Sequence, residues 1–470
     1  MQPPLDARQG DPIPTPLAGE VTVGAGQMAL AASEIAEVPA ETVEVEKFDA
    51  GKAARYAVAN YGASNVWMLF NTGMPLYLNT YGLHPALIAL LANERSFVGA
   101  LVQPIVGRIS DRTRTPLGRR RPFFLIGIPL MSVAIALLAL HPPFWIMLGI
   151  MTIAAFFLWV AIDPYMALMA DLFPPEHRGR VGGFQGLANA LGAITFSLMA
   201  FMLWEKNEPW VFAIVIILLI VTWAFTFFTV KEPPLLPYVK PDKSQRPSPM
   251  VYVRELFSYS QASRYTLAMT LFWMGNGGAA PFVTLFGTQS LGATEGESFL
   301  LPLAYIAVTA LLSVPAGMLA DRFGKKQVIS IGLLIYGVGA IIGSQSPNLL
   351  VATFALAVIG MGNACVAILI ALFTDMIPKV RAAEMVGLFS AVTSFAQPLG
   401  AALAGLVVGW VEINSGIEAA YRWAFIVAGI FILLGLGVLQ TVKPKRGMEE
   451  SRRGDADAEL VAVAPSGGAA

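Results

Sequence analysis

The chain has 470 residues, of which 56% are hydrophobic and only 13% are charged, whereas soluble domains usually carry about 25% charged residues. This composition excludes an ordinary soluble enzyme and indicates a polytopic membrane protein with no formal net charge. Cys365 is the only cysteine, and His84, His141 and His177 are the only histidines, so we expect neither a metal site nor a cofactor.

The chain begins with a stretch that we do not expect to fold. Residues 1–50 are rich in Pro, Gly, Ala and Glu and contain no uninterrupted apolar run. They lack the basic start and apolar segment of a signal peptide. We therefore predict a disordered cytosolic tail over 1–50.

Segments long enough to cross about 30 Å of hydrocarbon as helices follow one another from there. We predict twelve transmembrane helices, at 56–80, 85–107, 123–141, 143–171, 181–203, 209–230, 262–289, 298–320, 327–344, 347–376, 386–410 and 421–441. Pro and Gly inside these segments do not argue against helices, because neighbouring helices can satisfy the freed backbone groups. The expected fold class is an all-α membrane protein.

The basic residues support this count and orient the chain. All of the 31 lysines and arginines fall in predicted cytosolic loops or tails except Arg95, Lys206 and Arg422. Basic short loops stay on the cytosolic side, so we expect a multi-pass protein of the inner or plasma membrane with both termini in the cytosol.

The same count divides the chain into domains. A Pro-rich linker over 231–261 would separate a bundle of six helices over 51–230 from a second over 262–441, and a disordered cytosolic tail would occupy 442–470.

The two halves share motifs. The run Gly107-x-x-x-Asp111-Arg112…Gly118-Arg119-Arg120 recurs as Gly317-x-x-x-Asp321-Arg322…Gly324-Lys325-Lys326, and Asp171…Pro174…Arg178 recurs as Asp375…Pro378…Arg381. The two separations are nearly equal, which indicates duplication. Two repeats around a midplane site are typical of an alternating-access carrier.

The arginine-rich loop 107–122 resembles the loop between helices 2 and 3 of the major facilitator superfamily. With Gln103-Pro104 before it, it resembles the sugar-cation symporters, closest to the sucrose-proton branch. The resemblance implies two pseudo-symmetric six-helix bundles and a gating motif that latches them, formed by Gly107, Asp111, Arg112, Gly118, Arg119, Arg120, Asp321 and Arg322. The alternative is an arginine patch that only anchors the topology.

Three ionisable residues lie deep within predicted spans: Glu94, Arg95 and Asp163. Each costs about 2.5–3.5 kcal/mol at the centre of a membrane helix, which suggests a function. We expect Glu94 or Asp163 to carry the coupled proton, with Arg95 as counter-ion. The alternative is a structural ion pair that closes the bundle.

Around Asp163, the run Asp163-Pro164-Tyr165-Met166-Ala167 resembles the helix 4 pattern of bacterial relatives of the sucrose symporters. Met166 replaces the arginine of that pattern, and Ala155 stands where sucrose symporters carry another aspartate. The sodium-binding aspartates of the melibiose branch correspond to Gly99 and Gln103, so sodium coupling is disfavoured.

Polar and aromatic stripes at helical spacing supply candidates for substrate binding. Amides and aromatic rings are the groups that bind sugars, and those we select are Asn60, Trp67, Asn71, Trp159, Gln185, Asn189, Trp273, Asn276 and Gln397. The alternative for each residue is a contact between helices.

We therefore expect a sugar or glycoside carrier, coupled to protons and embedded in the lipid bilayer. No nucleotide-binding loop or hydrolase motif is present, so we expect no enzyme, and the arginine runs fit membrane topology better than nucleic acid. One alternative keeps the fold and moves another small organic solute in or out of the cell. Another is a membrane sensor that transports nothing.

Overall fold

The computed structural model describes residues 47–232, 257–366, 368–379 and 382–463. The chain divides into two units, Met1–Asp49 and Ala50–Ala470. Most of the predicted tail over 1–50, and residues 233–256 of the predicted linker, lie outside the described residues.

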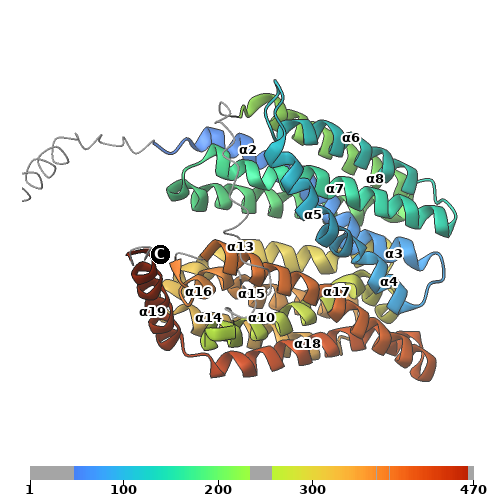
Figure 1. Ribbon diagram of the computed structural model, residues 1–470. Helices are drawn as coiled ribbons and strands as arrows, with labels where there is room; N and C mark the ends of the chain where they lie inside the picture. The colour runs from blue at the N-terminus through green and yellow to red at the C-terminus, as the bar shows by residue number, and fades with distance from the viewer. Residues whose placement is uncertain (1–46, 233–256, 367, 380–381, 464–470) are drawn as a thin grey trace, which may run out of the picture. The chain divides into compact units, whose positions relative to one another are not determined.

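The first half of the second unit is helical throughout, with short connections. Its elements are α2 (Ala50–Met68), the π-helix η1 (Leu69–Gly73), α3 (Met74–Asn79), α4 (Pro85–Ala92), α5 (Glu94–Arg112), α6 (Arg121–Leu138), α7 (Phe144–Leu172) and α8 (Pro175–Thr229). In Figure 1, α2 and α5–α8 lie together in one group, while α3 and α4 extend from it to the side of α17.

The second half is helical as well and forms a second group (Figure 1). Its elements are α10 (Ser260–Ala279), the 3₁₀-helix η3 (Ala280–Phe282), α11 (Val283–Leu285), the π-helix η4 (Phe286–Ser290), α12 (Glu295–Ser298), α13 (Leu300–Phe323), α14 (Lys325–Gly343), α15 (Leu349–Val366), α16 (Leu369–Thr374), α17 (Ala382–Ser415), α18 (Ile417–Thr441) and α19 (Pro444–Val463). The described part of the chain contains no β-strand, which confirms the predicted all-α class.

Nine helical stretches in the described residues are long and apolar enough to cross a membrane. One of them, α8, is 55 residues long and has non-helical backbone at Asn207, just before Pro209. It contains two of the spans predicted from the sequence. The predicted first and seventh spans are interrupted by η1 and by η3 and η4, and they are not among the nine. The count of twelve stays a prediction.

The predicted span 85–107 is found as one candidate membrane span, Pro85–Arg112, but its α-helix is interrupted at Asn93, between α4 and α5. Asn93 has φ −103° and ψ 5°, and its side-chain amide donates to the Ala89 carbonyl at 3.0 Å. Pro85 starts α4, and the ring nitrogen Nδ1 of His84 caps it by accepting from the Ala86 amide at 3.2 Å. Glu94 therefore begins a helix instead of sitting within one.

The duplication predicted from the motifs is visible in the geometry. Gly118 and Gly324, which are equivalent in the repeated motif, both have a left-handed backbone, with φ of +108° and +96°. Tyr56 and Tyr165 each donate a hydroxyl hydrogen bond to the other's carbonyl, at 2.7 and 2.8 Å. In the second half Tyr265 donates in the same way to Leu369, at 2.8 Å.

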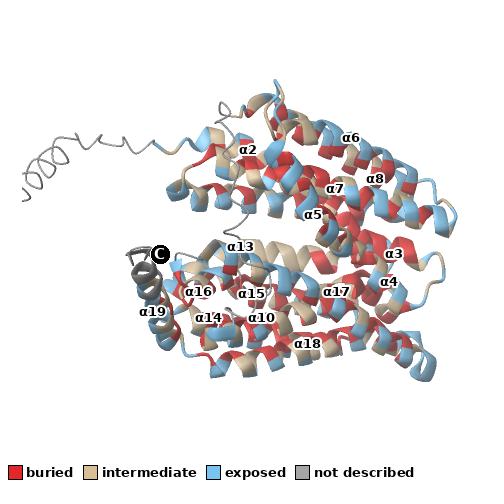
Figure 2. Ribbon diagram, in the orientation of Figure 1, coloured by how far each residue is buried: buried red, intermediate tan, exposed pale blue. Residues whose placement is uncertain are grey.

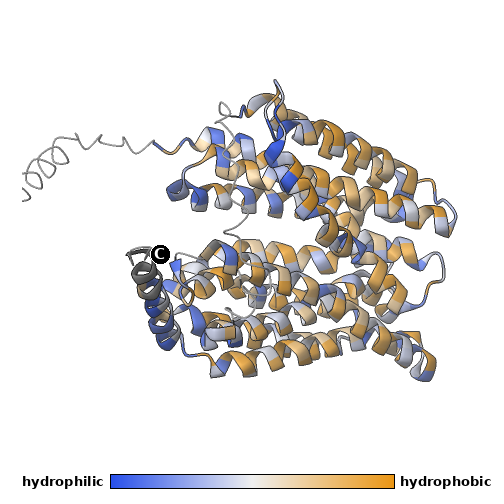
Figure 3. Cartoon of the chain, in the orientation of Figure 1, coloured by the Kyte–Doolittle hydropathy of each residue, from blue (hydrophilic) through white to orange (hydrophobic). Residues whose placement is uncertain are grey.

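The helices of both groups carry many residues that are hydrophobic and exposed, as the colours of Figures 2 and 3 indicate. Leu101, Phe228 and Leu311 are 73–74% exposed, which suits contact with lipid. Between helices, small residues permit close approach. A Cβ added to Gly400 of α17 would collide with the backbone of Met274 in α10, so these two helices touch backbone to backbone.

The predicted disorder over 442–470 is wrong for most of that range, because Pro444–Val463 form α19. Glu450 accepts hydrogen bonds from the Ser260 hydroxyl at 2.9 Å and from the Gln261 amide at 3.3 Å. The Ser451 hydroxyl donates to the Ile377 carbonyl at 2.8 Å. These contacts hold the charged helix against the end of the second group.

Candidate functional site

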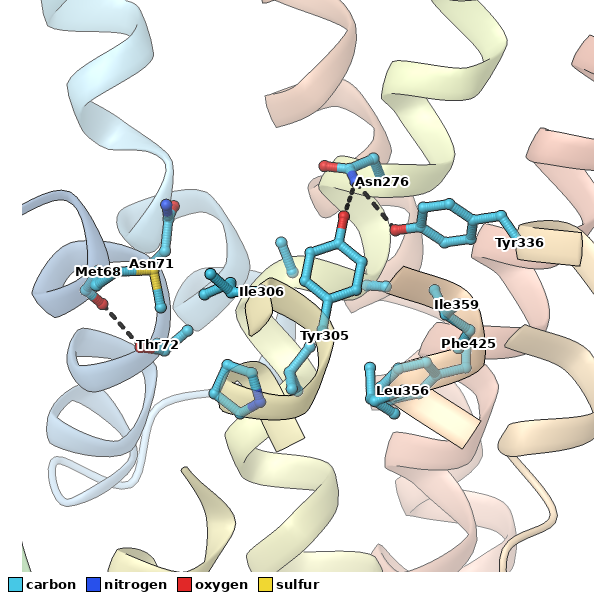
Figure 4. A pocket seen from close by; sticks show the side chains of 14 residues that line it. Met68, Asn71, Thr72, Asn276, Tyr305, Ile306, Tyr336, Leu356, Ile359 and Phe425 are labelled. Carbon is cyan, nitrogen blue, oxygen red and sulfur yellow. Dashed lines mark hydrogen bonds between the residues drawn. The ribbon is translucent and has the colours of Figure 1, made fainter. Parts of the chain in front are cut away.

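A cavity of about 180 Å³ lies where the two groups of helices meet (Figure 4). Helices of both groups line it, with the larger share from the second. The lining residues are Met68, Asn71, Thr72, Asn276, Ala279, Ala280, Val283, Pro302, Tyr305, Ile306, Tyr336, Leu356, Ile359 and Phe425. Most are apolar, so a few polar groups would orient whatever binds there.

Three of those polar groups form one cluster on α10, α13 and α14. Figure 4 shows the hydroxyls of Tyr305 and Tyr336 converging on the Asn276 side chain. The Asn276 amide donates to the Tyr336 hydroxyl at 3.0 Å and to the Tyr305 hydroxyl at 3.5 Å. A phenol hydroxyl can both donate and accept, and the Asn276 carbonyl can accept. The cluster therefore offers both donors and acceptors to a ligand.

The opposite wall belongs to the π-helix η1, which carries Asn71 and Thr72. The Asn71 side-chain oxygen accepts a hydrogen bond from the Arg95 guanidinium. Arg95 is only 3% exposed, donates also to the Ala92 carbonyl at 2.8 Å, and lies 4.5 Å over the Trp67 ring. The guanidinium thus reaches the cavity through Asn71, which it orients.

Two tryptophans predicted to bind substrate surround this arginine instead of lining the cavity. Trp159 donates its ring N–H to the Arg95 carbonyl at 2.8 Å and meets the Trp67 ring edge to face, with centroids 6.1 Å apart. A Cβ on Gly99 would overlap the Trp159 ring, so glycine there makes room for it.

The buried acids do not form the ion pair that we considered. Both carboxylate oxygens of Glu94 and one of Asp163 are buried without a hydrogen-bond partner within the described part of the chain. No Glu94–Arg95 salt bridge forms there either, so the predicted counter-ion role of Arg95 is not visible in this conformation. Glu94 is the first residue of α5, where the helix dipole favours a negative charge. Neither acid lines the cavity.

The other predicted substrate residues lie elsewhere. Of the nine, Asn71 and Asn276 line the cavity. Gln185 donates to the Tyr165 hydroxyl at 3.5 Å, and Gln397 presents its backbone to Gly277. Asn60 and Trp273 are half-buried and Asn189 is exposed, none of them in the cavity lining. These roles stay predictions.

The arginine-rich loop is held by three acids of its own group of helices. Arg120 pairs with Asp111 at 2.7 Å and with Asp171 at 3.3 Å, and Arg119 also pairs with Asp171. The Glu232 carboxylate accepts the backbone N–H groups of residues 119, 120 and 121 at 2.7–2.8 Å, at the start of α6. The loop is therefore fixed to α7 and to the end of α8.

The glycines of this loop differ in their role. A Cβ on Gly118, which has a positive φ, would collide with the Glu232 carboxylate, whereas Gly107 has open space around it. Arg112 is exposed. No ion pair links Asp111 or Arg112 to the second group of helices among the residues described.

In the second half, a lysine replaces the paired arginine. Lys325 contacts Asp375 at 2.6 Å, the equivalent of Arg119 with Asp171. Asp321 and Arg322 are exposed, and the Arg322 guanidinium lies 5.3 Å from the ring centre of Phe323. The gating function of the predicted motif residues stays a prediction.

The two groups meet at the end opposite loop 107–122. α4 packs against α17, where a Cβ on Gly405 would lie 2.7 Å from the Ala86 Cα. Trp204 donates to Glu295 at 3.2 Å, and the Thr284 hydroxyl donates to the Thr72 carbonyl at 2.9 Å. The cavity lies beside this last hydrogen bond, because Thr72 is one of its lining residues.

The sequence analysis missed Tyr305, Tyr336 and Thr72. Tyr305 and Tyr336 lie on separate helices and belong to no polar stripe, so only the fold brings them to Asn276. Thr72 follows Asn71 directly, and only the π-helix turns both toward the same space. A signal existed for Glu232, since an acid follows the sixth span directly and could have been matched to the loop arginines.

A family model described as MFS/sugar transport protein matches residues 55–434. The sucrose transport protein SUC3 of Arabidopsis thaliana is 25% identical over 223 residues, which cover 39% of this chain and 37% of the plant protein. The isoprimeverose transporter of Lactiplantibacillus pentosus is 22% identical over 432 residues, 83% of this chain and 88% of that protein. The chain thus spans little more than a third of the plant relative.

Solved structures share the fold. A bacterial homologue of the human lysosomal transporter Spinster, crystallised inward-facing and occupied, superposes with a TM-score of 0.68 at 16% identity, covering 85% of this chain and 97% of that one. A D-xylose-proton symporter superposes with a TM-score of 0.62 at 16% identity, covering 84% and 98%. At these identities the likeness concerns the fold alone.

Proposed function

This chain belongs to the family of MFS/sugar transport proteins, and on that premise we propose that it moves a sugar or glycoside across the membrane by proton symport. It is a multi-pass membrane transporter with the major facilitator fold and not an enzyme. The substrate and the coupling ion are the proposal.

The observation that carries the proposal is the polar cluster in the central cavity. Asn276, Tyr305 and Tyr336 offer an amide and two hydroxyls from one side, and Asn71 faces them from the other. Groups that both donate and accept suit the hydroxyls of a sugar. The cavity equals the volume of about six water molecules in the liquid, which corresponds to one sugar ring.

The apolar remainder of the lining supports a second candidate substrate. Ile306, Leu356, Ile359 and Phe425 would give a free sugar few partners for its hydroxyls. Buried hydroxyls without partners are costly. These residues favour a glycoside with an apolar substituent, or another small organic solute of lower polarity.

Proton coupling is supported by the acids that lack partners. An acid buried in a membrane protein without a partner is stable mainly when it is protonated. Among the described residues, both carboxylate oxygens of Glu94 and one of Asp163 are buried without a hydrogen-bond partner, although each residue as a whole is half-buried. Trp159, one helical turn before Asp163, bonds to Arg95, which bonds to Asn71. These contacts connect Arg95, the residue next to Glu94 in the chain, to the wall of the cavity.

The bundle contacts support alternating access. They lie at the end of the molecule opposite loop 107–122, so with that loop in the cytosol this conformation is closed to the outside. Transport then requires the contacts of α4 with α17 to open while the ends near loop 107–122 close. In that closed state Asp111 and Arg112 would meet the second bundle.

The test is uptake by purified full-length protein in proteoliposomes. Labelled mono- and disaccharides and aryl glycosides are offered with and without an inward proton gradient. We expect uptake of one class to exceed its equilibrium level only with the gradient, and a protonophore to abolish this accumulation. Accumulation that ignores both the gradient and the protonophore contradicts proton symport.

Asp163→Asn, with Glu94→Gln in parallel, identifies the titrating acid. We expect one variant to lose accumulation while retaining exchange of labelled for unlabelled substrate, because exchange needs no net proton movement. Glu418→Gln, at an exposed position in the first turn of α18, is the matched control and should accumulate normally. If only a solute that is not a sugar exchanges among the compounds offered, the result would favour the second candidate substrate, a small organic solute of lower polarity.

A further inference from the structure

An open hollow of about 790 Å³ lies where α14, α18 and α19 meet, and it shares no lining residue with the cavity. Its charged lining is mostly basic: Lys326, Lys443, Lys445, Arg446 and Arg453. The two acids there are Glu449 and Glu450, and Glu450 already accepts hydrogen bonds from Ser260 and Gln261. The hollow therefore carries an excess of positive charge.

The hollow lies at the level of a membrane surface. Lys326 is the second residue of the candidate span Lys325–Gly343, and Val442 follows the last residue of the span Ile417–Thr441. The Lys326 ammonium donates to the Gln440 carbonyl at 3.0 Å and to the Val442 carbonyl at 2.7 Å. Two membrane helices thus have an end at the hollow, and α19, whose described part is mainly hydrophilic (Figure 3), supplies the rest of its lining.

A groove of about 770 Å³ adjoins the hollow and shares Lys326 with it. It runs along α13 and α14, and its lining includes Leu319, Phe323 and Ile331, which are 46%, 54% and 55% exposed. These side chains lie within candidate membrane spans, where lipid covers exposed apolar surface. Cys365 of α15 and Gln440 of α18 complete the lining.

We propose that the hollow and the groove together bind one anionic phospholipid. The phosphate would lie among Lys443, Lys445 and Arg453, with Lys326 at the junction, and an acyl chain would fill the groove past Phe323. Basic pockets at the membrane surface select anionic head groups, and a groove that continues into the hydrocarbon region accounts for the chains. A soluble phosphate would use the hollow alone. The site is independent of the proposed sugar transport.

Binding is measured by native mass spectrometry of the delipidated full-length protein. The ligands are phosphatidylglycerol, phosphatidylcholine with the same acyl chains, and inorganic phosphate. We expect phosphatidylglycerol to bind at least tenfold more tightly than the other two. Equal binding of inorganic phosphate would show a free-anion site and overturn the lipid proposal, and equal binding of phosphatidylcholine would overturn the role of the basic residues.

Neighbouring arginines of α19 provide a matched pair of variants. Arg453 lines the hollow and Arg452 does not. Arg453→Gln should weaken phosphatidylglycerol binding about fivefold, which corresponds to about 1 kcal/mol per basic residue near anionic lipid, and Arg453→Lys should restore it. Arg452→Gln should have little effect. Equal losses in both variants would mean diffuse attraction to negative charge and no site.

Cys365, the only cysteine, reports on the groove. Saturating phosphatidylglycerol should slow alkylation of Cys365 by N-ethylmaleimide in the wild-type protein. The same concentration of inorganic phosphate should leave the rate unchanged. Alkylation that proceeds at one rate with and without bound phosphatidylglycerol would place the acyl chains elsewhere and overturn the proposal. This measurement does not depend on any variant folding.

Discussion

Replacing Gly405 by alanine should shift the protein away from the conformation described here. The new Cβ would lie 2.7 Å from the Ala86 Cα and 3.1 Å from the Pro85 carbonyl oxygen. Ordinary contacts between carbon atoms are about 3.5–4.0 Å. Because the obstacles are backbone atoms at the start of α4, no side chain can turn aside, and α4 and α17 must separate by roughly 1 Å.

The expected magnitude follows from the cost of overpacking, which is about 1–3 kcal/mol. Since the clash exists only while α4 and α17 are in contact, the whole cost falls on this conformation. The population of this conformation, relative to the conformation in which α4 and α17 have separated, should fall by about 5- to 150-fold. The higher helix propensity of alanine applies to both conformations and cancels.

The assay is a distance distribution between spin labels at Leu140 and Leu350, in a background that carries Cys365→Ser. These positions are 74% and 82% exposed and lie on opposite bundles at this end. Gly405→Ala should add a longer distance. Gly409→Ala should have a smaller effect, because its new Cβ meets the His84 ring, which can rotate.

Gly437→Ala on α18 is the control, because no atom lies within 4 Å of a Cβ placed there. Its distances should match those of the wild type. If Gly405→Ala gives the same distance distribution as Gly437→Ala, the contact between α4 and α17 does not participate in the conformational equilibrium. Our proposal that this contact closes the end opposite loop 107–122 is then refuted.

Three further variants test the site and the loop. Tyr336→Phe removes a hydroxyl from the cavity and should raise KM for the transported substrate about 3- to 10-fold. The control Tyr265→Phe loses a hydrogen bond to the Leu369 carbonyl outside the cavity, so it should lower Tm and leave KM unchanged. Glu232→Gln removes the charge that accepts three backbone N–H groups and should destabilise the protein by about 1–3 kcal/mol in denaturant titrations. The control is Glu176→Gln, at an exposed position in the first turn of α8, which should cost only about 0.3–1 kcal/mol. Thr284→Val removes the hydrogen bond to the Thr72 carbonyl. The loss of about 1 kcal/mol should raise the population of the open form, measured from the spin-label distances, about fivefold. Thr393→Val loses a hydrogen bond within its own helix and should leave these populations unchanged.

The sequence predicts an all-α membrane protein because the signal of a membrane span is additive: each apolar residue contributes to transfer into the bilayer. The break at Asn93 lies outside that signal. The apolar residues on both sides make one continuous segment, so hydropathy alone does not show where the helix is interrupted. Similarly, the charged composition of residues 444–463 predicts disorder, yet these residues form α19, which hydrogen bonds of Glu450 and Ser451 hold in place.

Predicting the site is harder for a related reason. Stripes along single helices identify Asn71 and Asn276, because each belongs to a polar face of its own helix. Tyr305 and Tyr336 become partners of Asn276 only when α10, α13 and α14 converge. The local periodicity of one helix contains no information about that convergence. For Glu232 the sequence does contain a signal, because an acid directly after the sixth predicted span could have been paired with the arginines of loop 107–122 by charge.

The division of residues between the bundles constrains how coupling can work. The first bundle holds the buried ionisable residues Glu94, Arg95 and Asp163, and the second holds most of the polar cluster around Asn276. A proton taken up in one bundle can influence a substrate bound by the other only through groups that touch both. Asn71 is such a group, because it accepts from Arg95 and lines the cavity. Asn71→Ala should therefore reduce the coupling ratio of protons to substrate more than it reduces affinity, whereas Asn276→Ala should do the reverse, and equal effects in direct measurements of proton and substrate flux would show that coupling follows another path.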